Sequence, residues 1–183
     1  MLKLTVYGTP VGKGSMKCVG KGGRHQVVPT NQNQLRPWAD ALTDAAAEAR
    51  ARGQAQRLGP VGVHAVITVA RPPSNRDALP VRRSKGGDID KQERTILDAL
   101  TGGGLIRDDS QVVHIDTVTV YPDSPILVDE DDQQVGRSGR LDSPGVVLWL
   151  YDVRLVCRTC VGLGEIAGVE GWCQVCDGTG VEV

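Results

Sequence analysis

Alternating apolar and polar residues open the chain, because residues 2–7 read Leu-Lys-Leu-Thr-Val-Tyr with the two-residue period of a half-buried strand. Apolar runs at 61–70, 111–121 and 146–156 predict three more strands. Ala-rich residues from about 33 to 52 and residues 90–100 predict two helices, each followed by glycine. The order of these elements predicts an α+β fold over residues 1–155, in which a mixed sheet packs on two helices in two layers.

Three segments between these elements lack such a pattern. Residues 8–23 are rich in glycine and predict a mobile loop. A basic loop is expected from Arg71 to Gly87, and residues 122–145 form an acidic loop that contains glycine and proline. No apolar stretch is long enough for a bilayer, and the first residues lack the apolar block of a signal peptide. We therefore expect a cytoplasmic protein of a bacterium or of a phage-infected host.

The composition restricts which side chains can form the core, and the distribution of charged residues indicates a candidate binding face. Phe is absent and aromatic residues make up 3%, so the core must rely on aliphatic side chains. The formal net charge is only −1, but basic residues gather at 1–36 and 71–87 while acids gather at 129–132. A local basic face can bind a phosphate backbone despite a neutral total, although solvated loops are the simpler interpretation. The candidate DNA-binding residues are Lys13, Lys17, Lys21, Arg24, Arg71, Arg76, Arg82, Arg83 and Lys85.

Four cysteines near the end of the chain form a short repeat. Residues 157–164 and 173–180 both read C-x-x-C-x-G-x-G. Two thiolates in one such turn can grip one metal ion, and two turns complete a tetrahedral Zn²⁺ site. Disulfide pairing is the alternative. We predict a small structural zinc module over residues 156–183, with the ligands Cys157, Cys160, Cys173 and Cys176.

The repeat resembles the cysteine-rich module of DnaJ-type chaperones over residues 157–180. No J-domain accompanies it, so the resemblance implies a metal site and not a chaperone activity. A closed four-sulfur site has no open position for water. We therefore expect the zinc ion to stabilise the fold of this terminal segment. The module would contact DNA or a protein partner and would not take part in catalysis.

Carboxylates occur in two stretches, at 88–90 and at 108–109. Asp88 and Asp90 lie at the entry to the second predicted helix, and Arg94 follows one turn after Asp90. The return through the glycines at 102–104 is expected to bring Asp108 and Asp109 back near that helix start. Carboxylates that converge repel one another unless a hard cation such as Mg²⁺ neutralises them, and this cation activates water for phosphodiester hydrolysis.

These acids also have a purely structural interpretation. Asp90 and Glu93 have the spacing of a capping box, and Asp108 and Asp109 could be turn residues. The pattern alone leaves both interpretations open.

The central segment resembles the RusA family of Holliday junction resolvases. The resemblance is carried by Asp88-Ile-Asp90, by Leu97-Asp-Ala-Leu-Thr101 and by Asp108-Asp-Ser-Gln-Val-Val113. Residues 6–14 are similar to the opening strand and loop of phage members, and the likeness spans roughly residues 3–155.

The resemblance implies a set of roles. Both acids of the D-x-D and the second acid of the D-D pair bind Mg²⁺ in that family, or Mn²⁺ in its place. They correspond here to Asp88, Asp90 and Asp109, with Asp108 as a neighbouring ligand. A homodimer is also implied, because two symmetric nicks need two related active sites. The basic loop at 13–24 is expected to clamp DNA.

One position departs from the family pattern. The family usually has an essential Lys four residues after the D-x-D, where this chain has Arg94. Arg keeps the positive charge but cannot act as a base. We expect Arg94 to stabilise charge on the phosphate.

The sequence thus predicts a Mg²⁺-dependent, structure-selective endodeoxyribonuclease that resolves four-way junctions in DNA recombination and repair. A general branched-DNA or flap nuclease would share the same site. The alternative from another class is a non-catalytic, zinc-stapled adaptor that binds DNA or protein.

Overall fold

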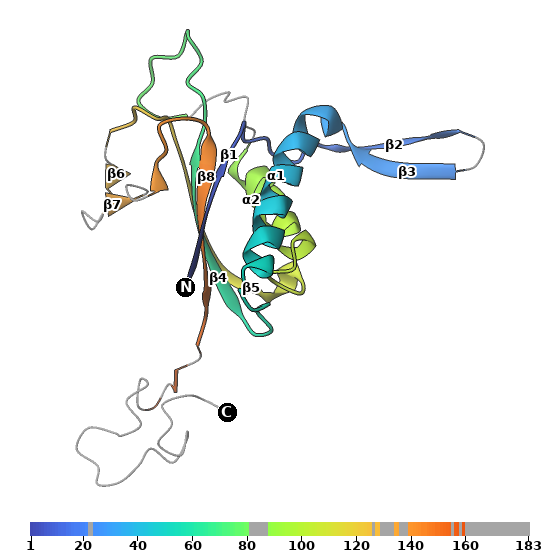
Figure 1. The fold of residues 1–183 in the computed structure, drawn as a ribbon. Coiled ribbons are helices and arrows are strands. Elements are labelled where there is room, and N and C mark those ends of the chain that lie inside the picture. The colour runs from blue at the N-terminus through green and yellow to red at the C-terminus, as the bar shows by residue number, and fades with distance from the viewer. Residues whose placement is uncertain are drawn as a thin grey trace. The chain divides into compact units, whose positions relative to one another are not determined.

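The computed structural model describes residues 1–21, 24–80, 88–125, 127–128, 134–135, 139–154, 156–157 and 159 of the 183. The chain divides into two compact units, Met1–Tyr151 and Asp152–Val183. The first unit carries the sheet and both long helices (Figure 1). Most of the second unit, including nearly all of the predicted zinc module, lies outside the described residues.

A four-stranded mixed sheet forms one layer of the first unit. Its strand order is β1 (Leu2–Tyr7), β8 (Gly145–Asp152), β4 (Val61–Thr68) and β5 (Val112–Val120). β1 pairs with β8 in antiparallel register, and β4 pairs with β5 in parallel register. Parallel neighbours need a crossover, and the helix α2 (Ile89–Gly102) provides it between β4 and β5.

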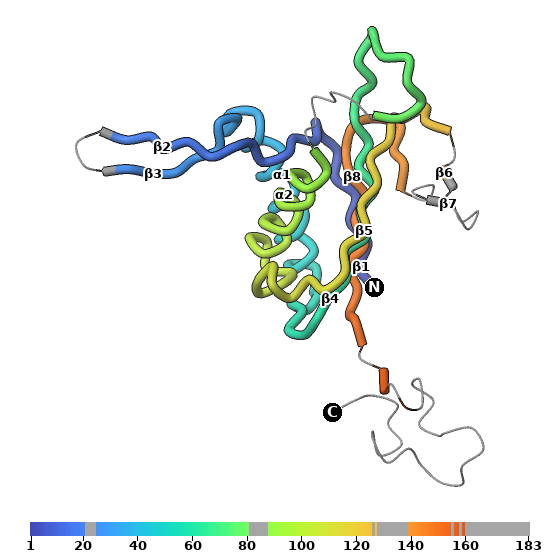
Figure 2. Tube along the Cα trace, turned by 180° about the vertical axis from the view of Figure 1, so that it is seen from behind, coloured from blue at the N-terminus to red at the C-terminus, as the bar shows by residue number. Residues whose placement is uncertain are grey.

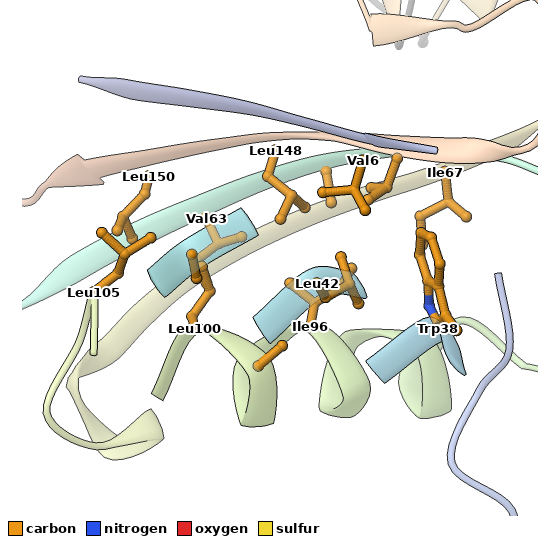
Figure 3. Packing of buried hydrophobic residues seen from close by; sticks show 14 of the residues in the cluster. Val6, Trp38, Leu42, Val63, Ile67, Ile96, Leu100, Leu105, Leu148 and Leu150 are labelled. Atoms are coloured by element: carbon orange, nitrogen blue, oxygen red, sulfur yellow. The ribbon is translucent and has the colours of Figure 1, made fainter. Parts of the chain in front are cut away.

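Both helices cover the same face of this sheet (Figures 1 and 2). α1 spans Gln32–Ala51 and buries Leu35, Trp38, Leu42, Ala46 and Ala49, a spacing of three and four residues that follows one helical stripe. α2 buries a similar stripe that includes Ile96 and Leu100. Figure 3 shows these side chains meeting residues of the sheet, so the core lies between the two layers.

The helices approach each other closely at the end of α2. A Cβ added to Gly103 would lie 2.4 Å from Cβ of Ala46 and 2.8 Å from the Thr43 carbonyl oxygen. Any larger residue would push the helices apart, so glycine is required here for packing rather than for a turn. This contact fixes the position of α2, which carries the first pair of candidate acids.

The glycine-rich region does not form the predicted loop throughout. β2 (Met16–Lys21) and β3 (Arg24–Pro29) pair as an antiparallel two-stranded ribbon that projects from the layered body (Figures 1 and 2). The prediction of a mobile loop over 8–23 is wrong for 16–21. Glycine at 20, 22 and 23 obscured the strand pattern, although extended backbone accommodates glycine.

The fold class predicted from sequence is confirmed for the first unit, since its sheet is mixed and its two helices form the second layer. Short elements complete the described chain: the 3-10 helix η1 (Asp109–Gln111), and the pair β6 (Leu127–Val128) and β7 (Gln134–Val135). Within the described part of the chain, neither helix has the length and apolarity that a bilayer-crossing segment needs.

Candidate active site and nucleic-acid interface

Asp88 and Asp90 lie at the N-terminus of α2. Asp88 is the N-cap residue, but its side chain makes no capping hydrogen bond. Its carboxylate instead accepts from Nζ of Lys91 at 2.6 Å, and 72% of its side chain is exposed. Asp90 is also exposed, in the first helical turn. The N-terminal end of a helix favours negatively charged groups. Because the Asp88 carboxylate makes no capping hydrogen bond, it remains available to a ligand.

Two basic residues follow these acids along α2. Lys91 pairs with Asp88, and this hydrogen bond is the main reason that the pKa of Lys91 is raised above its ordinary value. Arg94 is exposed and has no ion pair with another described residue. Sequence reasoning singled out Arg94 and missed Lys91. The available signal was the three-residue spacing from Asp88 to Lys91, which places both on one helical face.

Asp108 and Asp109 stand at the beginning of η1, and only Asp108 is committed to local structure. The Asp108 carboxylate accepts from the Ser110 amide at 2.9 Å. The Gln111 side chain accepts from the Asp108 amide at 3.1 Å, which completes a capping box. Hydrogen bonding from Ser110, first through its side chain and then through its backbone amide, is the main cause that lowers the pKa of Asp108. The neighbouring Asp109 is exposed.

The two acidic stretches do not meet within one chain. α2 has 14 residues and therefore extends about 21 Å, with Asp88 at its start and Asp109 a few residues beyond its end. Figures 1 and 2 show the start of α2 and the start of β5 at opposite ends of the layered body. Among the described residues, no group of three or more His, Cys, Asp or Glu side chains could share a metal ion.

The expectation that Asp108 and Asp109 return to the start of the helix is therefore wrong for a single protomer. The three glycines end α2, but the chain continues into β5, which carries it back along the helix only after Asp109. A helix and a following strand that pack together run in opposite directions, so their adjacent ends lie far from the helix start. The roles of the four acids are taken up below.

The loop before the ribbon is attached to the first half of α2. The Lys13 amide donates to the Lys91 carbonyl oxygen at 3.1 Å, and the Thr95 hydroxyl donates to the Val11 carbonyl oxygen at 3.4 Å. Nζ of Lys13 forms an ion pair with Asp98 at 2.7 Å. The ammonium group of Lys13 is thus held on α2, about two turns beyond Asp90, rather than free in solution.

The ribbon carries part of the predicted DNA-binding set. Lys17 on β2 is exposed, and Lys21 and Arg24 are paired positions at the end of the ribbon. Strand alternation places Lys17 and Val19 on one face, and Met16, Cys18, Val27 and His25 on the other. The second face has no acidic residue in the described part of the ribbon. A projecting ribbon of this kind can lie along a DNA groove.

The basic segment after β4 is only partly described. Arg71 forms an ion pair with Asp123 at 3.0 Å and lies over the Tyr121 ring, with Cζ 4.2 Å from its centroid. The guanidinium of Arg71 is the main cause that lowers the pKa of Asp123. Arg71 therefore holds the loop to the sheet, and among the described residues Arg76 is the exposed one of this set. Arg82, Arg83 and Lys85 lie outside the described residues.

The zinc prediction falls almost wholly outside the described residues. Of its four cysteines the structure describes Cys157, which is buried. Cys160, Cys173 and Cys176 belong to the part that is not described.

A comparison with family models matches residues 8–128 to the endodeoxyribonuclease RusA family. The matched span includes the ribbon, both helices and both pairs of acids, and it ends before the cysteine repeat. A search of the curated proteins found no match. The family match decides against the non-catalytic adaptor. Because it covers more than half of the sequence, the chain belongs to the RusA family of endodeoxyribonucleases, which resolve Holliday junctions.

Proposed function

We propose that this enzyme cuts four-way DNA junctions in a Mg²⁺-dependent reaction, with Asp88, Asp90 and Asp109 as the metal ligands and Arg94 beside the phosphate. Family membership supports the reaction class. The exposure of all three carboxylates supports their assignment, because the metal ion and the DNA must be able to reach the side chains that bind the metal. We leave Asp108 out of the proposed ligand set, because one of its carboxylate oxygens is committed to the Ser110 amide in the capping box of η1.

One chain alone does not fit a three-carboxylate site, because α2 separates Asp88 and Asp90 from Asp109. Two copies related by a twofold axis remove this difficulty. The Asp88–Asp90 pair of one protomer would face the partner's Asp109, and the same axis would create a second identical site. A homodimer would then supply both the complete ligand sets and the two cuts that a junction requires.

Mg²⁺, when bound, supplies an activated water and positive charge beside the scissile phosphate. Three exposed carboxylates repel one another, so this charge is also what allows them to converge. One carboxylate oxygen of Asp88 accepts from Nζ of Lys91, which leaves the other oxygen for the metal and holds the Lys91 ammonium beside the proposed site. Arg94 lies on the same helix as a permanent cation, suited to hold phosphate oxygens but not to remove a proton from water.

The DNA backbone is proposed to bind along the ribbon and the start of α2. Lys17 and Arg76 are exposed cations, while the Lys13 ammonium is held on α2 by Asp98. Lys21, Arg24, Arg82, Arg83 and Lys85 extend this set by sequence. Arg71 is assigned instead to holding the loop. Binding through phosphates predicts an affinity that falls steeply as salt rises.

The cysteine repeat is proposed to bind one structural Zn²⁺ through Cys157, Cys160, Cys173 and Cys176. Its spacing supports this assignment. The reduced thiolates that such a site requires suit the cytoplasm of a bacterial or phage-infected cell. The module would add a contact to DNA or to a protein partner.

The decisive test is the variant Asp90→Asn, which keeps size and helical position but removes the charge. We expect nicking of a synthetic four-way junction to fall at least about a hundredfold, as for loss of a group that stabilises the transition state, while junction binding in Ca²⁺ stays within about twofold. Asp44→Asn, a matched change at an exposed position of α1, should cleave like the wild type. Equal cleavage by wild type and Asp90→Asn would refute the assignment.

The same assay separates junction resolution from general flap cleavage. Four-way junction, flap and linear duplex are compared with and without Mg²⁺. Paired nicks in the junction at a rate at least tenfold above the flap support the proposal, and equal rates favour the branched-DNA nuclease.

A further inference from the structure

β5 forms one edge of the four-stranded sheet, and no described strand pairs with its outer side. The Val120 carbonyl oxygen accepts from the Val69 amide at 2.9 Å, so Val120 directs its backbone groups toward the β4 side. Backbone direction alternates along a strand, so Ile115, Thr117 and Thr119 direct their N–H and C=O groups away from the sheet. These groups form a template for one further strand.

The sequence of this edge lacks the features that usually protect an open strand. From His114 to Val120 it has no proline, lysine or arginine, and its single carboxylate is that of Asp116. The one shift in the register of β4 and β5 comes before this segment, between Val61 and Gly62. A regular edge about 20 Å long is therefore able to pair with another chain.

Thr117 lies near the middle of this edge and has an unused hydroxyl group. It pairs with Ala65 of the core, so its side chain lies on the helix-covered face of the sheet. Its Oγ1 atom is buried and has no hydrogen-bond partner among the described residues. A buried hydroxyl without a partner costs stability, and two Thr side chains on opposite strands can satisfy each other. Thr117 of a second copy is a partner of this kind.

α2 has an apolar flank on the same side of the molecule. α1 packs on β1 and α2 packs on β5, so the flank of α2 that faces away from α1 lies toward the open edge. Gly102 lies beside Thr43 of α1. Ile89 and Leu97 are each about 140° around the helix from Gly102, and Asp90 is about 120° from it. Ile89 is 44% exposed and Leu97 is only partly buried, so a neighbouring helix would cover apolar surface here.

A twofold axis perpendicular to the sheet, beside Thr117, would join these features. It places a second β5 antiparallel to the first and keeps the helices of both copies on one face. β5 begins just after Asp109, and α2 runs beside it in the opposite direction. The beginning of one β5 then lies next to the end of the other, where the partner's α2 begins. This arrangement brings Asp109 of one copy toward the partner's Asp88 and Asp90.

We infer that two copies of this chain pair through β5 in antiparallel register with the axis at Thr117, which joins two four-stranded sheets into one. The inference rests on the proposed function and adds to it the surface that holds the protomers together. In this register Asp116 lies opposite the partner's Val118. An axis one residue earlier would place two Asp116 carboxylates opposite each other, and their repulsion disfavours that register.

The test links the two strands by a disulfide in mixed dimers. One chain carries Asp116→Cys, a second chain with a longer tag carries Val118→Cys, and both carry Cys18→Ser. The two positions form a pair without mutual backbone hydrogen bonds, whose Cα atoms lie about 4.5 Å apart and suit a disulfide. After subunit exchange and oxidation with copper phenanthroline, we expect a linked species of mixed size that a reductant releases. Absence of this species would overturn the inference.

Lys3→Cys mixed with Thr5→Cys is the matched control, in the same Cys18→Ser background. Both residues are exposed, and they lie two positions apart on β1, the opposite edge of the sheet. This mixture should give no linked species. A yield equal to that of the β5 pair would show random collision and would overturn the inference.

The position of the axis has its own measurement. Thr117→Val keeps the shape of the side chain but removes the hydroxyl from both copies. We expect the dissociation constant of the dimer, measured by sedimentation, to rise about tenfold. Thr5→Val, at an exposed position of β1, should leave it unchanged. An unchanged constant for Thr117→Val would contradict an axis at Thr117.

Activity of the linked dimer separates this inference from the proposed function. The linked dimer with both sites intact should nick a four-way junction like the wild type. When the Asp116→Cys chain also carries Asp90→Asn and the Val118→Cys chain carries Asp109→Asn, one site of two is intact, so the rate should be about half. A linked but inactive dimer of this kind would refute the shared metal site and support the interface. Recovery in the mixture without any link would refute the interface and support the shared site.

Discussion

Asp108 and Asp109 are adjacent, exposed and chemically identical, yet the structure uses them differently. The Asp108 carboxylate is bonded to the Ser110 amide, while its own amide is bonded to Gln111. Gln111 also donates to the Gly59 carbonyl oxygen at 2.9 Å, so this box links η1 to the segment before β4. Asp109 has no such local task in the described structure. In the proposed assignment, one acid of the D-D pair serves folding and the other serves the metal site.

This division predicts opposite effects for two variants. Asp108→Ala should lower the Tm and leave junction cleavage within about threefold, because it removes a capping group. Asp109→Asn should abolish cleavage with an unchanged Tm. Thermal unfolding and nicking assays on both variants check this prediction. A stable but inactive Asp108→Ala enzyme would return Asp108 to the ligand set.

The effect of Asp108 on stability should also depend on pH. Its pKa is lowered in the folded state by the bond from Ser110, so the folded protein favours the charged form. The stabilisation is present above the ordinary carboxyl pKa of about 4 and is lost as the pH falls through the lowered pKa. The Tm difference between wild type and Asp108→Ala should therefore be present at pH 7 and shrink in acid.

At the scale of single elements, the regular pattern of α2 made the position of the helix predictable. It did not make the direction of the chain after the helix predictable. Ile96, Ala99 and Leu100 have the spacing of one buried stripe, and the predicted helix at 90–100 agrees with Ile89–Gly102. The direction of the following chain depends on how the helix packs on β5. That packing is set by contacts such as Gly103 on Ala46, which no local pattern encodes. The convergence of the acids was mispredicted for this reason.

The ribbon is a second case in which the local sequence pattern did not reveal the structure. Lys17, Cys18 and Val19 alternate, but glycines around them give a loop-like composition. The pairing of β2 with β3 brings together segments whose strand propensity is weak when each is taken alone. The sequence also suggested a capping box, but at Asp90 and Glu93. The structure has a capping box at Asp108 and Gln111 instead.

The ribbon also carries the prediction for DNA binding at this scale. Lys17→Ala should reduce the slope of log affinity against log salt by about one, because one phosphate contact is lost. Titrations of a four-way junction between low and moderate salt measure the slope. Lys3→Ala on β1 is the control, since Nζ of Lys3 lies over the Trp149 ring at 5.4 Å. An unchanged slope for Lys17→Ala would remove the ribbon from the binding face.

At the scale of the whole molecule, the chain adds a cysteine repeat to a nuclease domain. We expect about one zinc ion per chain in the purified protein, and its loss in the double variant Cys173→Ser with Cys176→Ser. Metal analysis after desalting measures the ratio. Cys18→Ser is the control, because Cys18 is exposed on the ribbon and lies outside the repeat. Zinc retained at full ratio in the double variant, or absent from the wild type, would contradict the prediction.

In the proposed arrangement, a complete site requires residues from two copies of the chain. If Asp90 of one protomer acts with the partner's Asp109, then mixing the inactive variants Asp90→Asn and Asp109→Asn should restore activity. Half of the randomly formed dimers are mixed and each has one intact site of two, so nicking should recover to about a quarter of the wild-type rate.

The control mixture separates this arrangement from a site within one chain. Asp90→Asn mixed with Asp88→Asn should stay inactive, because both changes affect the same half of the site and no combination leaves an intact one. Mixed dimers of Asp90→Asn and Asp109→Asn should also make single nicks rather than paired cuts, since their other site carries both defects. Subunit exchange is shown with two differently tagged chains. If the mixture of Asp90→Asn and Asp109→Asn then stays inactive, the site is not shared between two protomers. The 14 residues of α2 would then have to be bridged within one chain by a rearrangement of the segment around Asp109.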